Sequence, residues 1–212
     1  GKLRAERKIQ RTGYGVNLVA SLWGYKMSKI LIRNAVKRYG DHTVIPNLNL
    51  EIKDISFREI QKSDKTLLRE IYGSTRQEEL DKGTNWNDEQ KRLFIDQQFS
   101  VQHEYYQKNF LDAKFYIIEK EKVPVGRLYI DFLSENEPVR IIDITILPEW
   151  RNKNIGSSIL NEILKKAGSN NLNVSIHVEA FNPAMNLYKR LGFKKISETN
   201  GVYHLMEWNS NN

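Results

Sequence analysis

A polar stretch ahead of an apolar helix carries the residues best placed to do chemistry. In EWRNKNIGSSIL (149–160), two cations stand among asparagines and a single glycine, with nothing bulky between Asn154 and the start of the helix. Backbone N–H groups converge at a helix N-terminus and bind phosphate there, and nearby cations strengthen the binding. We therefore predict an anion-binding loop made by Arg151, Asn152, Lys153, Asn154, Ile155, Gly156 and Ser157.

The strands that must position this loop are predicted from alternating apolar residues. They cover residues 55–60, 114–119, 125–133, 139–147 and 172–180, and two short strands finish the chain. In VSIHVEA (174–180), the alternation sends Ser175, His177 and Glu179 to one face and the valines and Ile176 to the other.

The helices are predicted from apolar spacing and from capping residues. Asp64 would cap a short helix to Tyr72, and Asn87 or Asp88 a long one to about Lys108. A third helix covers residues 155–167 and stops at Gly168, and a fourth runs from a cap at Asn182 to Gly192. The order βααβββαβαββ predicts an α/β domain with a mixed sheet.

Composition limits the class of protein. The 212 residues are 40% apolar, which suits one main core. No apolar run approaches the roughly 20 residues that span a bilayer, so a soluble, cytoplasmic protein without a membrane partner is expected. The absence of cysteine excludes disulfides, thiolate zinc sites and covalent thioester intermediates on the chain. The histidines form no metal-spacing cluster, and no metal is expected.

The net charge of +7 is confined to one end of the chain. Residues 1–54 hold 11 Lys and Arg against 4 Asp and Glu, whereas residues 55–212 carry both signs equally. This balance disfavours nucleic acid as a partner. We divide the chain into a basic N-terminal extension, residues 1–54, and an α/β domain, residues 55–212.

The end of the extension resembles another kind of domain. Residues 27–54 alternate around Gly40 and Asp41, which predicts a hairpin. They resemble the opening strands of an ABC-transporter ATPase domain, in which a turn aromatic, here Tyr39, stacks on adenine. The Gly-rich phosphate loop of that family does not follow, so ATP binding is not expected. A nucleotide- or partner-binding role of this hairpin is one alternative for the function of the chain.

Two segments of the α/β domain resemble the GNAT acetyltransferases. The family fingerprint is Gln/Arg-x-x-Gly-x-Gly/Ala at a helix start, and the chain matches it at Arg151 and Gly156. Asn154 replaces the first Gly, and Asn is the residue other than Gly that most readily takes the left-handed conformation. VEAFNPAMNLYKRLGF (178–193) is similar to a later signature, in which a strand leads through Asn into a helix. The resemblance covers residues 55–212.

This resemblance implies a GNAT-like mixed central sheet, flanked by helices and splayed between two central strands. Acetyl-CoA, as co-substrate, would enter the gap between residues 141–147 and 174–180. Its pyrophosphate would lie on the amides of residues 152–157. Its pantetheine arm would bond to the backbone of Ile144 and Ile146 and to the side chain of Asn182.

The resemblance also implies which groups move protons. An alkyl amine arrives charged and must lose a proton, and the departing thiolate benefits from a donor. Tyr188 stands at the position of the family's donor. His177 stands where some relatives carry a Glu that acts as base, and an imidazole can accept a proton near neutral pH. Asp131, Asp143 and Glu179 are the alternatives for the base.

The predicted function is that of an acetyl-CoA-dependent N-acetyltransferase. The acetyl group would pass directly to a primary amine of a small molecule or peptide, in an aromatic-rich pocket between residues 86–110 and 203–208. A homodimer is compatible with the sequence. The alternative is a GNAT-fold module that binds CoA or a partner without catalysis, for which Asn154 is the main support.

Overall fold

The computed structural model describes residues 50, 52–132 and 138–211. The hairpin expected in residues 27–54, and with it the ATPase resemblance, lies almost wholly outside the described residues. Leu50 is buried in the core of the α/β domain, and Ile52 forms a bridge with Ile55. The domain therefore extends back to at least residue 50, a few residues before the predicted boundary.

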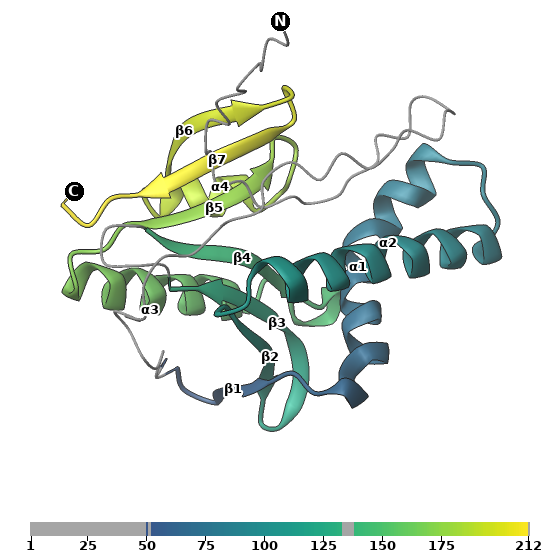
Figure 1. Cartoon of the computed structure of the whole chain (residues 1–212), viewed down its shortest axis with the longest axis horizontal. Helices are drawn as coiled ribbons and strands as arrows, with labels where there is room; N and C mark the ends of the chain where they lie inside the picture. The colour runs from purple at the N-terminus through teal and green to yellow at the C-terminus, as the bar shows by residue number, and fades with distance from the viewer. Residues whose placement is uncertain (1–49, 51, 133–137, 212) are drawn as a thin grey trace, which may run out of the picture.

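The elements follow the predicted order (Figure 1). They are β1 (Ile55–Glu59), α1 (Lys65–Gly83), α2 (Asp88–Asn109), β2 (Lys114–Lys120), β3 (Val123–Asp131), β4 (Val139–Ile146), α3 (Ile155–Ser169), β5 (Val174–Glu179), α4 (Met185–Arg190), β6 (Lys194–Thr199) and β7 (Tyr203–Trp208). Two short 3-10 turns, η1 (Lys62–Asp64) and η2 (Pro148–Trp150), precede α1 and follow β4.

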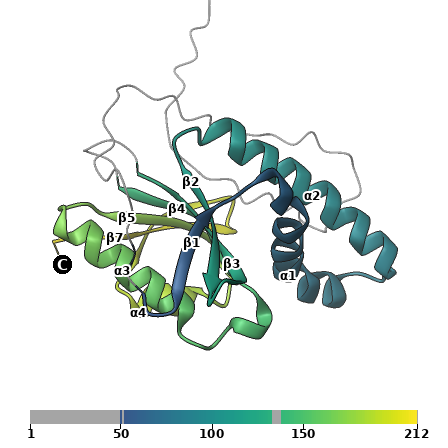
Figure 2. The ribbon, with the colours of Figure 1, turned by 90° about the horizontal axis from the view of Figure 1, so that it is seen from below.

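The strands form one mixed seven-stranded sheet in the order β1-β2-β3-β4-β5-β7-β6. Among these strands, β4 and β5 are the parallel neighbours and all other pairs are antiparallel. Helices α1 and α2 cover one face, and α3 with α4 lies against the other (Figure 2). The predicted α/β class with a mixed sheet is confirmed.

Strand alternation divides the core between the two faces. Val174, Ile176 and Val178 of β5 join the larger apolar cluster, which packs around α3 and α4. His177 and Glu179 point to the opposite face, where the aromatic side chains of α1 and α2 form a second cluster. The polar residues of β5 thus lie beneath α1 and α2, as the alternation predicts.

Helix α1 is longer than expected and begins differently. It runs eleven residues beyond Tyr72, to Gly83. A Cβ atom at Gly73 would lie 3.4 Å from Ile95, so α1 packs closely against α2 at this point. Asp64 does not cap it. The Asp64 carboxylate instead accepts hydrogen bonds from the Gln61 N–H at 2.7 Å and from the Arg58 guanidinium.

The starts of the other helices agree more closely with the sequence. The Asn87 side chain accepts from the Gln90 N–H at 2.9 Å, and Gln90 Oε1 accepts from the Asn87 N–H at 3.0 Å, so the predicted cap of α2 is a capping box. Asn182 Oδ1 accepts from the Ala184 N–H at 2.9 Å, three residues before α4 begins at Met185. Gly168 lies inside α3, where its missing side chain leaves room for Trp208.

Gly126 of β3 generates the first prediction. A Cβ atom there would lie 2.1 Å from the backbone oxygen of Thr145 on β4, and backbone cannot move aside as a side chain can. We expect Gly126→Ala to lower the free energy of unfolding by about 1 to 3 kcal/mol in urea titrations. The control is Gly73→Ala in α1, which faces only an ordinary contact and should keep or raise stability. Equal stabilities of the two variants would contradict the close approach of β3 and β4.

Candidate active site

The central strands of the sheet part after three residue pairs. Strands β4 and β5 pair from Val139 and Val174 as far as Ile141 and Ile176. At that point β4 carries a bulge, since Tyr129 lies opposite Asp143 and Ile130 opposite Ile141. A bulge bends its strand and strengthens the local twist. Beyond the bulge, the two strands continue without pairing and leave a gap.

The backbone of β4 faces this gap at the two predicted positions. The Leu147 N–H donates to the Val125 carbonyl of β3 at 2.9 Å. Because successive residues of a strand direct their backbone groups to opposite sides, Ile144 and Ile146 direct theirs away from β3 and toward the gap. The Ile146 carbonyl accepts from Arg151 Nε at 2.9 Å. The gap therefore presents a strand edge to which an extended molecule can bond.

The predicted anion-binding loop lies at the open end of the gap. Asn152 and Asn154 both adopt the left-handed conformation, with φ of 59° and 61°. The expected conformation of Asn154 is confirmed, and α3 begins at the next residue. The first N–H groups of a helix have no partner within it, so those of the first turn of α3 are available to a ligand. Ser157 Oγ donates to the Asn154 carbonyl at 2.9 Å and holds the turn closed.

The cations of the loop make contacts with the protein itself. Arg151 Nη2 donates to the Ser74 carbonyl of α1 at 3.4 Å, in addition to the bond with Ile146. Lys153 Nζ lies 4.7 Å from the centre of the Trp150 ring, a cation–π contact. Arg151 thus ties the loop to α1, and Lys153 lies folded over the preceding turn.

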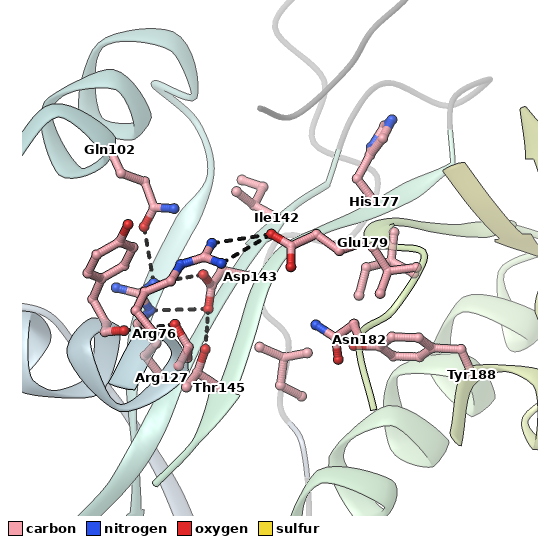
Figure 3. A pocket seen from close by; sticks show the side chains of 15 residues that line it. Arg76, Gln102, Arg127, Ile142, Asp143, Thr145, His177, Glu179, Asn182 and Tyr188 are labelled. Atoms are coloured by element: carbon pink, nitrogen blue, oxygen red, sulfur yellow. Dashed lines mark hydrogen bonds and ion pairs between the residues drawn. The ribbon is translucent and has the colours of Figure 1, made fainter. Parts of the chain in front are cut away.

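A pocket opens on the gap and receives side chains from α1, α2, β3, β4, β5 and α4 (Figure 3). The charged residues that line it are two arginines and two carboxylates: Arg76, Arg127, Asp143 and Glu179. Tyr188 and Asn182 close the pocket on the side of α4. The aromatic residues of α2 lie instead in the core, so the expected aromatic-rich pocket is wrong for this cavity.

One arginine–carboxylate pair is buried at the base of the pocket. Arg127 Nη2 donates to Asp143 Oδ2 at 2.7 Å and Nε donates to Oδ1 at 3.1 Å. Thr145 Oγ1 also donates to Oδ1, at 2.9 Å, and Gln102 Oε1 accepts from Arg127 at 3.2 Å. Burial lowers the pKa of Arg127, but the Asp143 charge outweighs it and raises the pKa overall. The Arg127 guanidinium therefore stays charged at any ordinary pH.

A second pair bridges α1 and β5 across the gap. Arg76 Nη1 and Nη2 donate to Glu179 Oε1 at 3.2 and 3.3 Å. Nη1 also contacts Glu79 Oε2 at 3.2 Å. The side chains of Arg76 and Glu179 are 11% and 8% exposed, so this pair, too, is largely withdrawn from solvent.

The family model described as acetyltransferase (GNAT) family matches residues 71–193, more than half of the chain. The chain belongs to this family. The match spans the gap, the anion-binding loop, Asn182 and Tyr188, and the family that it describes is one of acetyltransferases.

One curated relative and two solved structures illustrate the likeness. Histone acetyltransferase MCC1 of Arabidopsis thaliana is 29% identical over 97 residues, which cover 44% of this chain and only 39% of that protein. PaiA N-acetyltransferase of Thermoplasma acidophilum, in complex with coenzyme A, is 19% identical with a TM-score of 0.55, over 73% of this chain and 98% of that one. Spermidine N-acetyltransferase of Vibrio cholerae, in complex with CoA and spermine, is 18% identical with a TM-score of 0.51, over 76% and 98%. At these identities, the two structures show the shared GNAT fold.

Tyr188 and Asn182, two of the predicted site residues, both line this pocket. Tyr188 is 5% exposed and packs edge-on against Phe193. Burial, and then the charge of Asp143, raise its pKa, so the phenol keeps its proton at neutral pH. Asn182 uses its oxygen for the turn before α4, which leaves its side-chain amide to face the pocket.

His177 lies at the edge of the pocket in contact with Arg140. Arg140 Nη2 donates to His177 Nδ1 at 3.1 Å, and the imidazole points away from Glu179 and Tyr188 (Figure 3). Burial and the Arg140 charge lower the pKa of His177 to about 3. Such an imidazole is a weak proton acceptor, so the geometry argues against His177 as the base. Asp131 of β3, an alternative base, pairs with Arg140 of β4 and does not line the pocket.

Sequence reasoning missed Arg76 and Arg127. Arg127 stands on a strand, PVGRLYID, whose buried positions are mostly apolar or aromatic, and an arginine at such a position signals a buried partner. Arg76 gives no comparable signal, because its partner Glu179 lies 103 residues away. Within the described residues, no group of three or more His, Cys, Asp and Glu could hold a metal, and no helix is long and apolar enough to cross a membrane.

The left-handed Asn154 yields a prediction about acetyl-CoA affinity. We expect Asn154→Gly to bind acetyl-CoA within about twofold of the wild type, whereas Asn154→Val, strained by about 1 to 3 kcal/mol at positive φ, binds about tenfold more weakly. Calorimetric titration measures both. The matched control is Asn171→Val, which carries similar strain at φ 55° beyond the far end of α3 and should leave binding unchanged. Wild-type affinity of Asn154→Val would show that the loop does not hold the cofactor.

His177 yields a prediction about stability and pH. Its pKa is about 3 in the folded chain and about 6.5 when unfolded, so the unfolded state binds the proton first and stability falls as the pH drops below 6.5. Between pH 7 and pH 4.5, the wild type should lose about 2 to 3 kcal/mol that His177→Gln does not lose, as measured by urea unfolding. His204→Gln, a residue beside Glu198, should retain the loss. Parallel pH profiles of wild type and His177→Gln would contradict the burial of a neutral imidazole.

Proposed function

We propose that this GNAT transfers the acetyl group of acetyl-CoA directly to a primary amine of a small molecule or peptide. The observation that carries the proposal is the gap after Ile141 and Ile176, which is edged by free strand backbone, closed by Tyr188 and bounded by the anion-binding loop. The residues present fit the co-substrate, because a strand edge, a helix N-terminus and a side-chain amide suit its pantetheine arm and phosphates.

Particular residues would hold each part of the co-substrate. The first turn of α3, residues 155–157, with the Asn152–Asn154 turn would receive the pyrophosphate, and the backbone of Ile144 and Ile146 with the Asn182 amide would receive the arm. Bound acetyl-CoA supplies an activated acetyl thioester, and the reaction forms a C–N bond, breaks the C–S bond and releases one proton. Arg151 already occupies the Ile146 carbonyl, so it would exchange this bond as the arm binds.

Tyr188 would give a proton to the departing sulfur. Its raised pKa keeps the phenol protonated, and it faces the pocket from α4. A phenol with a raised pKa gives up its proton to water only rarely. Transfer of the proton becomes more favourable when negative charge develops on a sulfur atom beside it. Burial also keeps competing water away from the hydroxyl.

Glu179 would take the proton from the acceptor amine, directly or through a water. The sequence offered Glu179 as an alternative for the general base, and two observations favour it over His177. Its carboxylate lines the pocket near Asp143 and Tyr188, whereas the His177 ring turns away (Figure 3). The His177 lone pair at Nδ1 is occupied by Arg140.

Tyr188→Phe tests the proposed donor. We expect kcat for acetyl transfer to an acceptor amine to fall about 100-fold, because loss of one proton-transfer group has this effect, while the affinity for acetyl-CoA stays within about twofold. Thiol release measures turnover and calorimetry measures binding. Tyr116→Phe on β2, outside the pocket, is the control.

The outcomes separate the two functions that the sequence left open. Unchanged turnover of Tyr188→Phe would assign the donor role elsewhere. Binding of acetyl-CoA without transfer to any amine would mean a non-catalytic binding module. Binding of ATP in place of acetyl-CoA would favour the nucleotide-binding alternative for residues 1–54.

A further inference from the structure

The Arg76–Glu179 pair indicates the chemistry of the acceptor. We infer that the acceptor is a zwitterionic α-amino acid, whose ammonium group replaces Arg76 on Glu179 while its carboxylate replaces Glu179 on Arg76. This inference rests on the proposed function and names the substrate class of the same pocket. It is carried by the geometry of the pair, by the charge of the pocket and by the cost of separating the pair.

The geometry of the pair leaves donors and acceptors for a ligand. Both guanidinium contacts go to one oxygen, Glu179 Oε1, at 3.2 and 3.3 Å, whereas Arg127 bonds to both oxygens of Asp143, at 2.7 and 3.1 Å. Among the described residues, Glu179 Oε2 accepts no side-chain hydrogen bond, and in Figure 3 the second oxygen of Glu179 carries no dashed line. An ammonium group can therefore reach Oε2 before the existing pair separates.

The charge of the pocket argues against a polycation. Its two arginines match its two carboxylates, and burial keeps His177 neutral at ordinary pH. Asp143 is already satisfied by Arg127 and Thr145, which fixes that pair in place. A polyamine would bring several positive charges to a pocket without a free negative one, and such an excess is unfavourable where water is excluded.

Separating Arg76 from Glu179 costs free energy, and this cost favours an acceptor that carries both an ammonium and a carboxylate group. A plain amine that took Glu179 would leave the Arg76 Nη2 group without its carboxylate, because the remaining acid, Glu79, contacts Nη1. Removing one partner of a buried ion pair is destabilising, and Arg76 would keep only the half-buried Glu79 carboxylate as its counter-charge. An α-amino acid replaces both partners at once, so every charge keeps a counter-charge.

The position of the pair suits the reaction. Glu179 is the last residue of β5, beyond the last pair with β4, so an amine bonded to it lies in the part of the gap that Tyr188 and Asn182 also line. Arg76 comes from α1 above the gap, and the carboxylate of the acceptor would point toward this helix. The amine then lies toward the co-substrate and the carboxylate lies away from it.

Matched acceptors test the inference. The full chain with acetyl-CoA is offered leucine, leucinamide and 3-methylbutylamine, and likewise tyrosine, tyrosinamide and tyramine, with spermidine as polyamine. These trios share a side chain and differ at the carboxylate. Across a wider set of α-amino acids, the best should show kcat/KM at least about tenfold above that of its own amide and amine, since each charge-assisted contact contributes about 1.5 to 3 kcal/mol.

Variants locate the preference at Arg76. In Arg76→Gln, the ratio of kcat/KM for the amino acid to that for its amide should fall to near one. The double variant Arg76→Gln/Glu179→Gln removes both charges and keeps the test open if the single variant does not fold. Because it lacks the proposed base, it is compared by calorimetric titration with the amino acid and its amide, which should bind with equal affinity. Arg69→Gln, an ion-paired arginine of the same helix whose partner Asp96 lies on α2, should keep the wild-type ratio.

Each outcome has a separate meaning. An amide, an amine or spermidine that is used as well as or better than every amino acid overturns the inference and leaves the proposed transferase in place. A carboxylate preference that persists in the variants overturns the role of Arg76 and with it the inference. Acetyl-CoA binding without transfer to any acceptor of the panel overturns the inference together with the proposed small-molecule function.

Discussion

The separation of two parallel strands is the constraint on which the site depends. Strands β4 and β5 pair over three residues and then part at the bulge beside Ile142. Backbone groups withdrawn from water need partners, and the edge of β4 that faces the gap has no strand partner beyond Ile141 among the described strands. The opening persists because β3 holds β4 on one side and β7 holds β5 along its whole length on the other. The sheet thereby keeps a gap between its two central strands and still remains one continuous sheet.

Charges near this opening are compensated in pairs. Arg127 with Asp143 and Arg76 with Glu179 come from four different elements, so each pair fixes the position of a helix or strand against another. The pairs differ in tightness: the first is bonded through both oxygens and supported by Thr145, and the second uses one oxygen. A rigid pair and an exchangeable one thus lie within one pocket, and this difference assigns them a structural and a ligand-binding part, respectively.

Local patterns predicted much of this arrangement. The alternation in VSIHVEA predicted which side chains of β5 leave the apolar core, and the Asn154 substitution predicted a left-handed residue. Local patterns failed where the deciding contact is remote. Asp64 looks like a helix cap until Arg58 and Gln61 claim its carboxylate, and His177 looks like a base until Arg140 occupies it. No spacing rule connects Arg76 with Glu179, because the fold alone brings them together.

The bond from Arg151 to the Ser74 carbonyl has a consequence for the order of events on the molecule. Ser74 and Arg76 are neighbours on α1, so the loop that would hold the nucleotide end of the cofactor and the arginine that would hold the acceptor are attached to one rigid helix. If α1 shifts when one ligand binds, the residues that hold the other ligand shift with it, and the affinity for that ligand changes. Thermodynamic linkage then requires that each ligand alter the affinity for the other by the same factor. Helix α1 would thereby couple the binding of the cofactor to the binding of the acceptor.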